Sequence, residues 1–330
     1  MTIVVTGAAG HVGSNLCAAL RAQGREVRAV DIRRPVRALD HGAHWLRADV
    51  RDPAAMAAAL DGCEIVYHLA AVISIAGGLG GLVHSTNVDG VRVVARAALA
   101  RGVRRFVHCS SVHAFDLAAC AGQPVDETAP SCTRASLPAY DRSKAAGEVE
   151  LRRVIDGGLD AVVINPTGII GPADDTPSRM GSVLLALWRR RLPALVAGGF
   201  DWVDVRDVVE ALCAAAERGR TGENYLVCAH RRSVSDLARL AAQVSGAAVS
   251  MRTAPTALVR SFGPVGYLVA RMTGTALLPT REALHALSSF PTVDGAKAVQ
   301  ELGHQPRPIE ETFTDLHAFF VRTGRLRRRS

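Results

Sequence analysis

The chain has 330 residues, of which 48% are hydrophobic and 21% are charged. This length suits one large domain with a smaller one attached, and the composition is that of a globular protein rather than a disordered one. The formal net charge of +8 comes from 37 arginines and two lysines scattered along the chain, while aromatic residues make up 5%. A nucleic-acid partner is therefore not expected, because it needs a basic stripe interleaved with aromatic residues.

Two further features of the chain bear on its location. The seven cysteines are an odd number without a C-x-x-C pair, and the sequence opens on a strand-like segment at residues 2–5 rather than a secretory leader. The apolar segment 258–278 is interrupted by Arg260 and Arg271, so a membrane span is not expected. We expect reduced thiols, no metal site and a cytoplasmic location.

Short apolar runs alternate with longer amphipathic ones through the first 170 residues. Strands are predicted at 3–6, 26–31, 65–69, 105–109 and 161–165, with helices at 12–22, 53–60, 87–101 and 140–155. Strands that alternate with helices predict a doubly wound α/β domain of the Rossmann type, with a parallel sheet covered on both faces. Ligands on such sheets bind at the carboxyl ends of the strands, near the switch in strand order.

The first strand runs into a glycine-rich turn. Residues 4–13 read Val-Val-Thr-Gly-Ala-Ala-Gly-His-Val-Gly, which spaces Gly7, Gly10 and Gly13 as G-x-x-G-x-x-G rather than G-x-G-x-x-G. Glycines let backbone N–H groups approach a pyrophosphate, whose charge the following helix N-terminus favours. A tight turn without a ligand is the alternative, but the position at the first β-to-α junction favours dinucleotide binding.

Asp31 ends the second predicted strand. A carboxylate at this place can accept hydrogen bonds from the adenosine ribose and repels a 2′-phosphate, which favours NAD. Arg33 and Arg34 follow at once, and either could reach a 2′-phosphate, so NADP is the alternative.

The pattern Tyr140-x-x-x-Lys144 indicates a catalytic pair. Residues at i and i+4 share one helix face, so both side chains can reach one ligand. A phenol titrates near 10, and we expect the ammonium of Lys144 to lower that value towards neutrality. Ser110 and Ser111 follow the strand that ends at Cys109, where a hydroxyl could bind a substrate oxygen. Together they predict a phenol that exchanges a proton with that oxygen during hydride transfer.

These motifs together resemble the extended short-chain dehydrogenase/reductases, the NAD-dependent epimerase/dehydratase superfamily. The resemblance covers essentially the whole chain and gives Ser111, Tyr140 and Lys144 the catalytic positions. It places Asp49 and Val50 at the adenine, and Leu69, Ala70 and Ala71 along the path to the nicotinamide. Asn87 matches a family residue near the cofactor, with a helix N-cap as the alternative. The remaining cofactor positions that it implies are His11, Val12, Ile32, Arg33, Pro166, Gly168 and Ile169.

Residues 164–172 are most similar to the dihydroflavonol 4-reductase and 3β-hydroxysteroid dehydrogenase branch, which implies an oxidoreductase acting on a carbonyl or hydroxyl group of a small apolar molecule. The alternative is a nucleotide-sugar epimerase, or a related dehydratase, that keeps NAD tightly bound. Dehydratases of the family place an acidic residue directly after the catalytic hydroxyl, whereas the first carboxylate here is Asp116. A dinucleotide-sensing protein without catalysis is disfavoured because Tyr140 and Lys144 are both present.

The alternation of strands and helices loosens after Gly171-Pro172, which predicts an NAD(P)-binding domain at 1–171, with about 201–228 added, and a smaller substrate-binding region at about 172–200 and 229–330. Residues 202–217 and 224–227 are expected to return to the sheet. A homodimer would form through the helices that contain Asn87 and Tyr140. Candidate substrate contacts are Ile73, His113, Phe115, Met180 and Trp202; the apolar ones are also typical of a core, and His113 suits a pocket wall, an auxiliary acid/base or a structural histidine.

Overall fold

The structure is a computed structural model that describes residues 2–35, 40–75, 77–120, 122–192, 195–246, 253–254, 287 and 292–327. The apolar segment 258–278 lies outside these residues. Within the described ranges, none of the helices combines the length and apolarity that a membrane crossing needs. No cluster of His, Cys, Asp or Glu in the same part of the chain could hold a metal ion.

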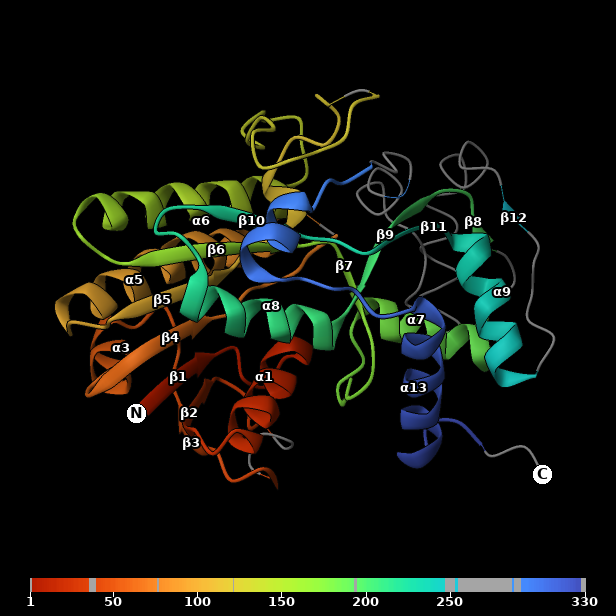
Figure 1. The fold of residues 1–330 in the computed structure, drawn as a ribbon, viewed down its shortest axis with the longest axis horizontal. Coiled ribbons are helices and arrows are strands. Elements are labelled where there is room, and N and C mark those ends of the chain that lie inside the picture. Colours follow the sequence, from red (N-terminus) through yellow and green to blue (C-terminus); the bar gives the residue numbers. More distant parts are fainter. Residues whose placement is uncertain are drawn as a thin grey trace.

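A central sheet of seven strands is built mostly from the first half of the chain (Figure 1). All its strand pairs are parallel, and the order is β10-β6-β5-β4-β1-β2-β3. The strands are β1 (Thr2–Thr6), β2 (Glu26–Asp31), β3 (His44–Arg47), β4 (Cys63–His68), β5 (Arg105–Cys109), β6 (Ala161–Pro166) and β10 (Asn224–Val227). The order reverses between β1 and β4, so the doubly wound Rossmann prediction is confirmed.

Helices cover both faces of this sheet, as Figure 1 shows. One face carries α1 (His11–Ala22) and α8 (Val205–Arg218), and the other carries α3 (Pro53–Ala59), α5 (Gly90–Ala100) and α6 (Ala139–Asp156). The four predicted helices are among them. Because both faces are covered, the strands read as nearly continuous apolar runs rather than as alternating ones.

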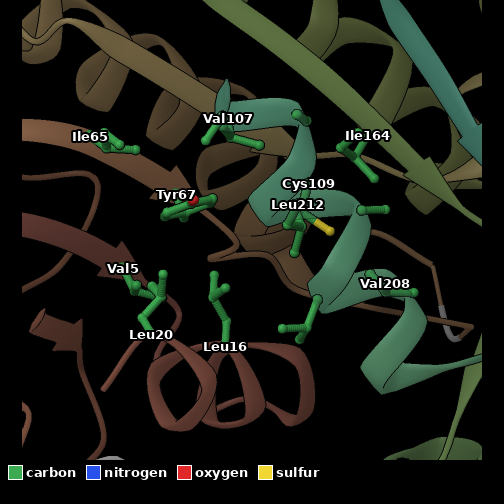
Figure 2. Packing of buried hydrophobic residues seen from close by; sticks show 14 of the residues in the cluster. Val5, Leu16, Leu20, Ile65, Tyr67, Val107, Cys109, Ile164, Val208 and Leu212 are labelled. Carbon is green, nitrogen blue, oxygen red and sulfur yellow. The ribbon is translucent and has the colours of Figure 1, made fainter. Parts of the chain in front are cut away.

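The core on the α1/α8 face shows why these segments pack together. Val5, Tyr67, Val107 and Ile164 point from four neighbouring strands into one buried cluster (Figure 2). Leu16 of α1 and Val208 and Leu212 of α8 close this cluster from the helical side (Figure 2). Burial of each large apolar side chain stabilises the fold by about 1.5–3 kcal/mol, so the apolar stripe of each helix fixes it on the sheet.

A smaller sheet begins at the carboxyl edge of the large one, because β7 (Gly168–Ile170) follows β6 after Thr167. It has the order β11-β9-β7, with β9 (Gly199–Asp204) and β11 (His230–Ser233). Residues 224–227 join the large sheet as expected, but Trp202 lies in β9, so the prediction that the whole segment 202–217 returns to the large sheet is wrong. The sequence pattern does not show which sheet a strand joins, because a buried strand is equally apolar in both sheets.

A second core holds the late helices against the smaller sheet. It contains α7 (Arg179–Trp188), α9 (Val234–Ser245) and α13 (Ile309–Arg322), next to the short pair β8 (Leu195–Val196) and β12 (Thr253–Ala254). Trp188 meets Phe313 and Phe320 edge-on, with ring centroids 6.3 and 6.1 Å apart. Its indole nitrogen donates to the Ala241 carbonyl at 3.0 Å, so one side chain joins all three helices.

Candidate active site

The glycine-rich turn between β1 and α1 is too tight for side chains. Gly7 has φ of +71°, and a Cβ there would come within 2.6 Å of the Ala70 nitrogen. A Cβ on Gly13 would overlap the Gly7 carbonyl oxygen, which also accepts the Gly10 amide at 3.0 Å. The turn therefore requires glycine at both positions, and the backbone reaches the loop after β4 without a side chain between.

The N-terminus of α1 opens into a pocket. No side chain caps this helix at Gly10, so the first-turn amides are free to bind an anion. Two arginines, two hydroxyl groups, one histidine and one carboxylate line this pocket with backbone amides; the lining residues are Ala9, Gly10, His11, Ser14, Arg33, Arg34, Pro35, Asp175 and Thr176. A pocket of this chemistry, next to a turn that a Cβ would fill, fits the phosphates of a dinucleotide.

His11 ties the glycine-rich turn to the loop after β7. Its Nε2 lies 3.0 Å from the Pro172 carbonyl oxygen, and Asn15 donates to the His11 carbonyl at 2.8 Å. The side chain therefore links the glycine-rich turn to the loop that carries Asp175 and Thr176, two residues of the pocket lining.

Asp31 lies at the carboxyl end of β2, buried below the same turn. Its Oδ2 accepts the Ala9 amide at 2.9 Å and its Oδ1 accepts the Arg33 amide at 2.8 Å. The carboxylate thus fixes the turn and still has lone pairs for a ribose. Ile32 and Arg33 are exposed beside it.

The other predicted cofactor positions lie along the same edge of the sheet. Asp49 forms a bidentate ion pair with Arg51, with an Oδ2–Nη2 distance of 2.6 Å, which lowers the pKa of the Asp49 carboxyl. Val50 is buried against Gly90. Val12 lies in the first turn of α1, Leu69, Ala70 and Ala71 follow β4 directly, Pro166 ends β6, and Gly168 and Ile169 begin β7.

Lys144, Tyr140 and Ser111 meet at the carboxyl end of β5. Lys144 is buried and donates from Nζ to the Cys109 carbonyl at 3.1 Å. Tyr140 is half-buried one helical turn earlier, and its phenol is hydrogen-bonded to Ser111. Ser111 also accepts the His113 amide at 3.2 Å, which caps the short 3₁₀ turn Val112–Ala114. The structure brings together the three side chains that the sequence paired.

The pKa of Tyr140 differs from the expectation. Burial raises the pKa of Tyr140, and the hydrogen bond with Ser111 offsets part of this increase. In the protein alone the pKa of Tyr140 is therefore raised and not lowered as expected, while the Lys144 ammonium donates to the Cys109 carbonyl. Burial also lowers the pKa of Lys144 itself. The protein alone therefore stabilises the neutral phenol, the form that donates a proton.

Asn87 clamps the loop after β4 to α6. Its Oδ1 accepts the Val72 amide at 2.7 Å, while Nδ2 donates to the Val72 carbonyl at 3.0 Å and to Ser143 Oγ at 2.9 Å. Ser143 in turn donates to the Tyr140 carbonyl at 2.6 Å. The N-cap interpretation is wrong, because Asn87 lies within the π-helical turn Ser85–Asp89 that runs directly into α5.

Two stacked imidazoles lie beneath Lys144. The ring centroids of His68 on β4 and His108 on β5 are 5.4 Å apart at 20°. Thr6 Oγ1 lies 2.8 Å from His68 Nδ1, whereas the other three ring nitrogens have no hydrogen-bond partner in the described part of the chain. Burial and the Lys144 charge lower the pKa of His68 to about 3 and that of His108 well below its usual value. Both rings are neutral at physiological pH.

The candidate substrate residues fall into three environments. Phe115 and Trp202 are buried in the second core, Met180 is half-buried in the first turn of α7, and Ile73 is 59% exposed. His113 lies against Tyr140, with ring centroids 5.9 Å apart. The proximity of Asp141 to His113 and of Ser143 to Asn87 was not predicted, because each pair joins elements that are far apart along the chain.

Comparison with known proteins decides the family. The model of the NAD-dependent epimerase/dehydratase family matches residues 3–228. The chain belongs to this family. Membership confirms the extended short-chain dehydrogenase/reductase prediction, and with it an enzyme of NAD-dependent type.

Individual relatives match over nearly their full length. The chain is 33% identical to sterol demethylase protein B of Methylococcus capsulatus, covering 98% of this chain and 99% of that protein. It is 30% identical to a Synechocystis protein with the provisional name dihydroflavonol 4-reductase, covering 97% and 94%. The crystal structure of gox2253 has a TM-score of 0.84 at 32% identity and covers 99% of both chains. The dihydroflavonol reductase-like likeness is thus confirmed.

Proposed function

We propose that this chain is an NAD(P)-dependent oxidoreductase that transfers hydride between a nicotinamide and a carbonyl or hydroxyl group of a small apolar molecule. The observation that carries the proposal is the meeting of Tyr140, Ser111 and Lys144 at the carboxyl end of β5. A neutral phenol beside a second hydroxyl is the arrangement that protonates a carbonyl oxygen.

The cofactor would be held by the turn at Gly7–Gly13, by Asp31, and by the residues that follow β4 and β6. The first-turn amides of α1 suit the pyrophosphate, and Asp31 suits the adenosine ribose, with NAD favoured over NADP. Residues 1–171 and about 201–228 would bind the dinucleotide, while about 172–200 and 229–330 would bind substrate. The nicotinamide, when bound, supplies or accepts the hydride.

The chain's own residues handle the proton. Ser111 would position the substrate oxygen by a hydrogen bond, and Tyr140 would give it the phenolic proton during reduction or take the hydroxyl proton during oxidation. Lys144 is fixed by Cys109 within reach of the same site, and its charge would favour the phenolate that remains after donation.

The proposed substrate class rests on two observations. The names of the two relatives refer to a sterol and to a dihydroflavonol, both ring systems with a large apolar surface. The carboxylate that could support sugar dehydration is also occupied, because Asp116 forms a bidentate pair with Arg134 at 2.6 and 2.8 Å. This pair holds the pKa of Asp116 below its usual value, so it is a poor proton donor.

The test is turnover of free cofactor. NADH and NADPH are each mixed with the protein and a panel of fused-ring ketones, and absorbance at the reduced-nicotinamide band is followed. Loss of absorbance that depends on ketone supports the proposal. A flat signal with every ketone, together with interconversion of a sugar nucleotide, would show that the chain is an epimerase.

A further inference from the structure

His113 occupies a defined position beside the catalytic phenol. Its ring is stacked on Phe200, with centroids 5.4 Å apart at 9°, and meets Tyr140 edge-on at 5.9 Å and 65°. Its backbone amide is bound by Ser111. Both groups that would hold a substrate oxygen therefore contact this residue, so a bound substrate would lie against the imidazole.

Asp141 lies beside the same ring. Its Oδ1 lies 3.4 Å from Nδ1 of His113, and the two side chains are 14% and 19% exposed. This nitrogen is buried and has no hydrogen-bond partner in the described part of the chain, and the Asp141 carboxylate faces it at ion-pair distance. A carboxylate at one imidazole nitrogen stabilises the cation that forms when the other nitrogen takes a proton.

The opposite nitrogen is available for chemistry. Nε2 of His113 has no hydrogen-bond partner in the described ranges and is not fully buried, so it is accessible to solvent or to a ligand. Among the described residues, Tyr140 and Asp141 are the titratable groups with a close approach to the ring. A partly buried imidazole with one nitrogen facing a carboxylate and the other accessible is a general acid/base arrangement.

We propose that His113 and Asp141 form a second acid/base pair, which moves a proton at the carbon next to the substrate carbonyl. The inference rests on the proposed function, because it needs a ketone whose oxygen is held by Ser111 and Tyr140. The enzyme then catalyses α-proton exchange in addition to hydride transfer, as an enolisation requires.

The step balances within the site. Nε2 of His113 takes a proton from the α-carbon, the C–H electron pair forms the carbon–carbon double bond, and the carbonyl oxygen takes the proton of Tyr140. The product is the enol, with an imidazolium facing Asp141 and a phenolate beside Ser111. Reversal returns one proton to carbon and one to Tyr140, so no oxidant or reductant is consumed.

The experiment uses 2-decalone, a fused-ring ketone with hydrogens on both carbons beside the carbonyl. The protein is incubated with NAD⁺ and 2-decalone in D₂O, where reduction cannot proceed, and α-deuterium is followed by mass spectrometry above the rate without enzyme. Reduction of the same ketone by NADH is measured separately. We expect wild-type protein to do both.

Variants assign the exchange to the pair. His113→Phe keeps an aromatic ring against Phe200, and Asp141→Asn keeps the imidazole; each should lower the ratio of exchange to reduction by at least about a hundredfold, the scale of acid/base catalysis. The matched control is His44→Phe, at an exposed histidine on β3, which should leave the ratio unchanged. An unchanged ratio in His113→Phe would overturn the proposal.

The two proposals fail in different ways. Reduction without enzyme-dependent exchange would remove the His113–Asp141 pair and keep the oxidoreductase. Exchange without reduction would keep the pair and remove the oxidoreductase. If wild-type protein does neither, both proposals are contradicted for fused-ring ketones.

Discussion

Lys144 donates a hydrogen bond from Nζ to the carbonyl of Cys109, 35 residues earlier in the chain, at 3.1 Å. Cys109 is the last residue of β5, and the two serines follow it directly. The bond therefore fixes the first turns of α6 against the end of β5, which brings the phenol of Tyr140 to Ser111. Two short motifs become one site through this contact.

Removal of the phenolic hydroxyl tests the proton donor. In Tyr140→Phe, turnover of any ketone that wild-type protein reduces should fall at least about a hundredfold, because the phenolic proton donor is removed. Binding of NADH, followed by its fluorescence, should stay nearly unchanged, since the ring is retained. Near wild-type turnover would show that another residue supplies the proton.

A methyl group in the glycine-rich turn should disrupt the proposed binding site for the pyrophosphate. In Gly13→Ala the new Cβ would overlap the Gly7 carbonyl oxygen, and we expect NADH affinity to fall at least about tenfold with a loss of stability of about 1–3 kcal/mol. Gly78→Ala is the control, because its Cβ meets nothing within 4 Å and its φ is −79°. Equal affinities in the two variants would contradict the placement of the pyrophosphate.

The carboxylate of Asp31 should set the preference between the two dinucleotides. In Asp31→Ala, the amides of Ala9 and Arg33 lose their acceptor, and the repulsion of a 2′-phosphate disappears, so NAD should bind more weakly and its advantage over NADP should narrow. Dissociation constants from calorimetry give the ratio. Asp31→Asn separates charge from hydrogen bonding, and a ratio equal to wild type in both variants would rule out the ribose contact.

The buried imidazole pair should make the fold sensitive to acid. The folded pKa values of His68 and His108 lie below the unfolded value of about 6.5. The unfolded chain therefore binds protons that the native state does not. Stability present above pH 6.5 is then lost as pH falls, by about 1.4 kcal/mol per pH unit for each ring, and for His68 this continues to about pH 3.

Replacement of one ring tests this linkage. His108→Leu should change the free energy of unfolding little at pH 7.5, because neither ring nitrogen has a partner in the described part of the chain. At pH 5 the variant should be more stable than wild type by about 2 kcal/mol. Urea unfolding at both pH values measures the difference, with an unchanged m-value as the control. If the free energy of unfolding falls equally between pH 7.5 and pH 5 in the variant and in wild type, the linkage is refuted.

The fold of the nucleotide-binding half follows closely from the sequence. The five predicted strands and four predicted helices are present, because buried parallel strands and amphipathic helices have different apolar periods that local reading can detect. The fold of the later half follows less directly from the sequence. β7 and β9 form a separate sheet with β11, and a buried strand carries no mark of the sheet it joins.

The sequence by itself determined the chemistry that each motif can carry: a turn that needs glycine, a carboxylate at the end of β2, and a phenol one helical turn before a lysine. These are local properties of residues close in the chain. Only the tertiary structure decided their partners: Cys109 for Lys144, Ser143 for Asn87 and Asp141 for His113. Such contacts join different elements, and their distances depend on how the helices pack on the sheet, which spacing along the chain does not encode.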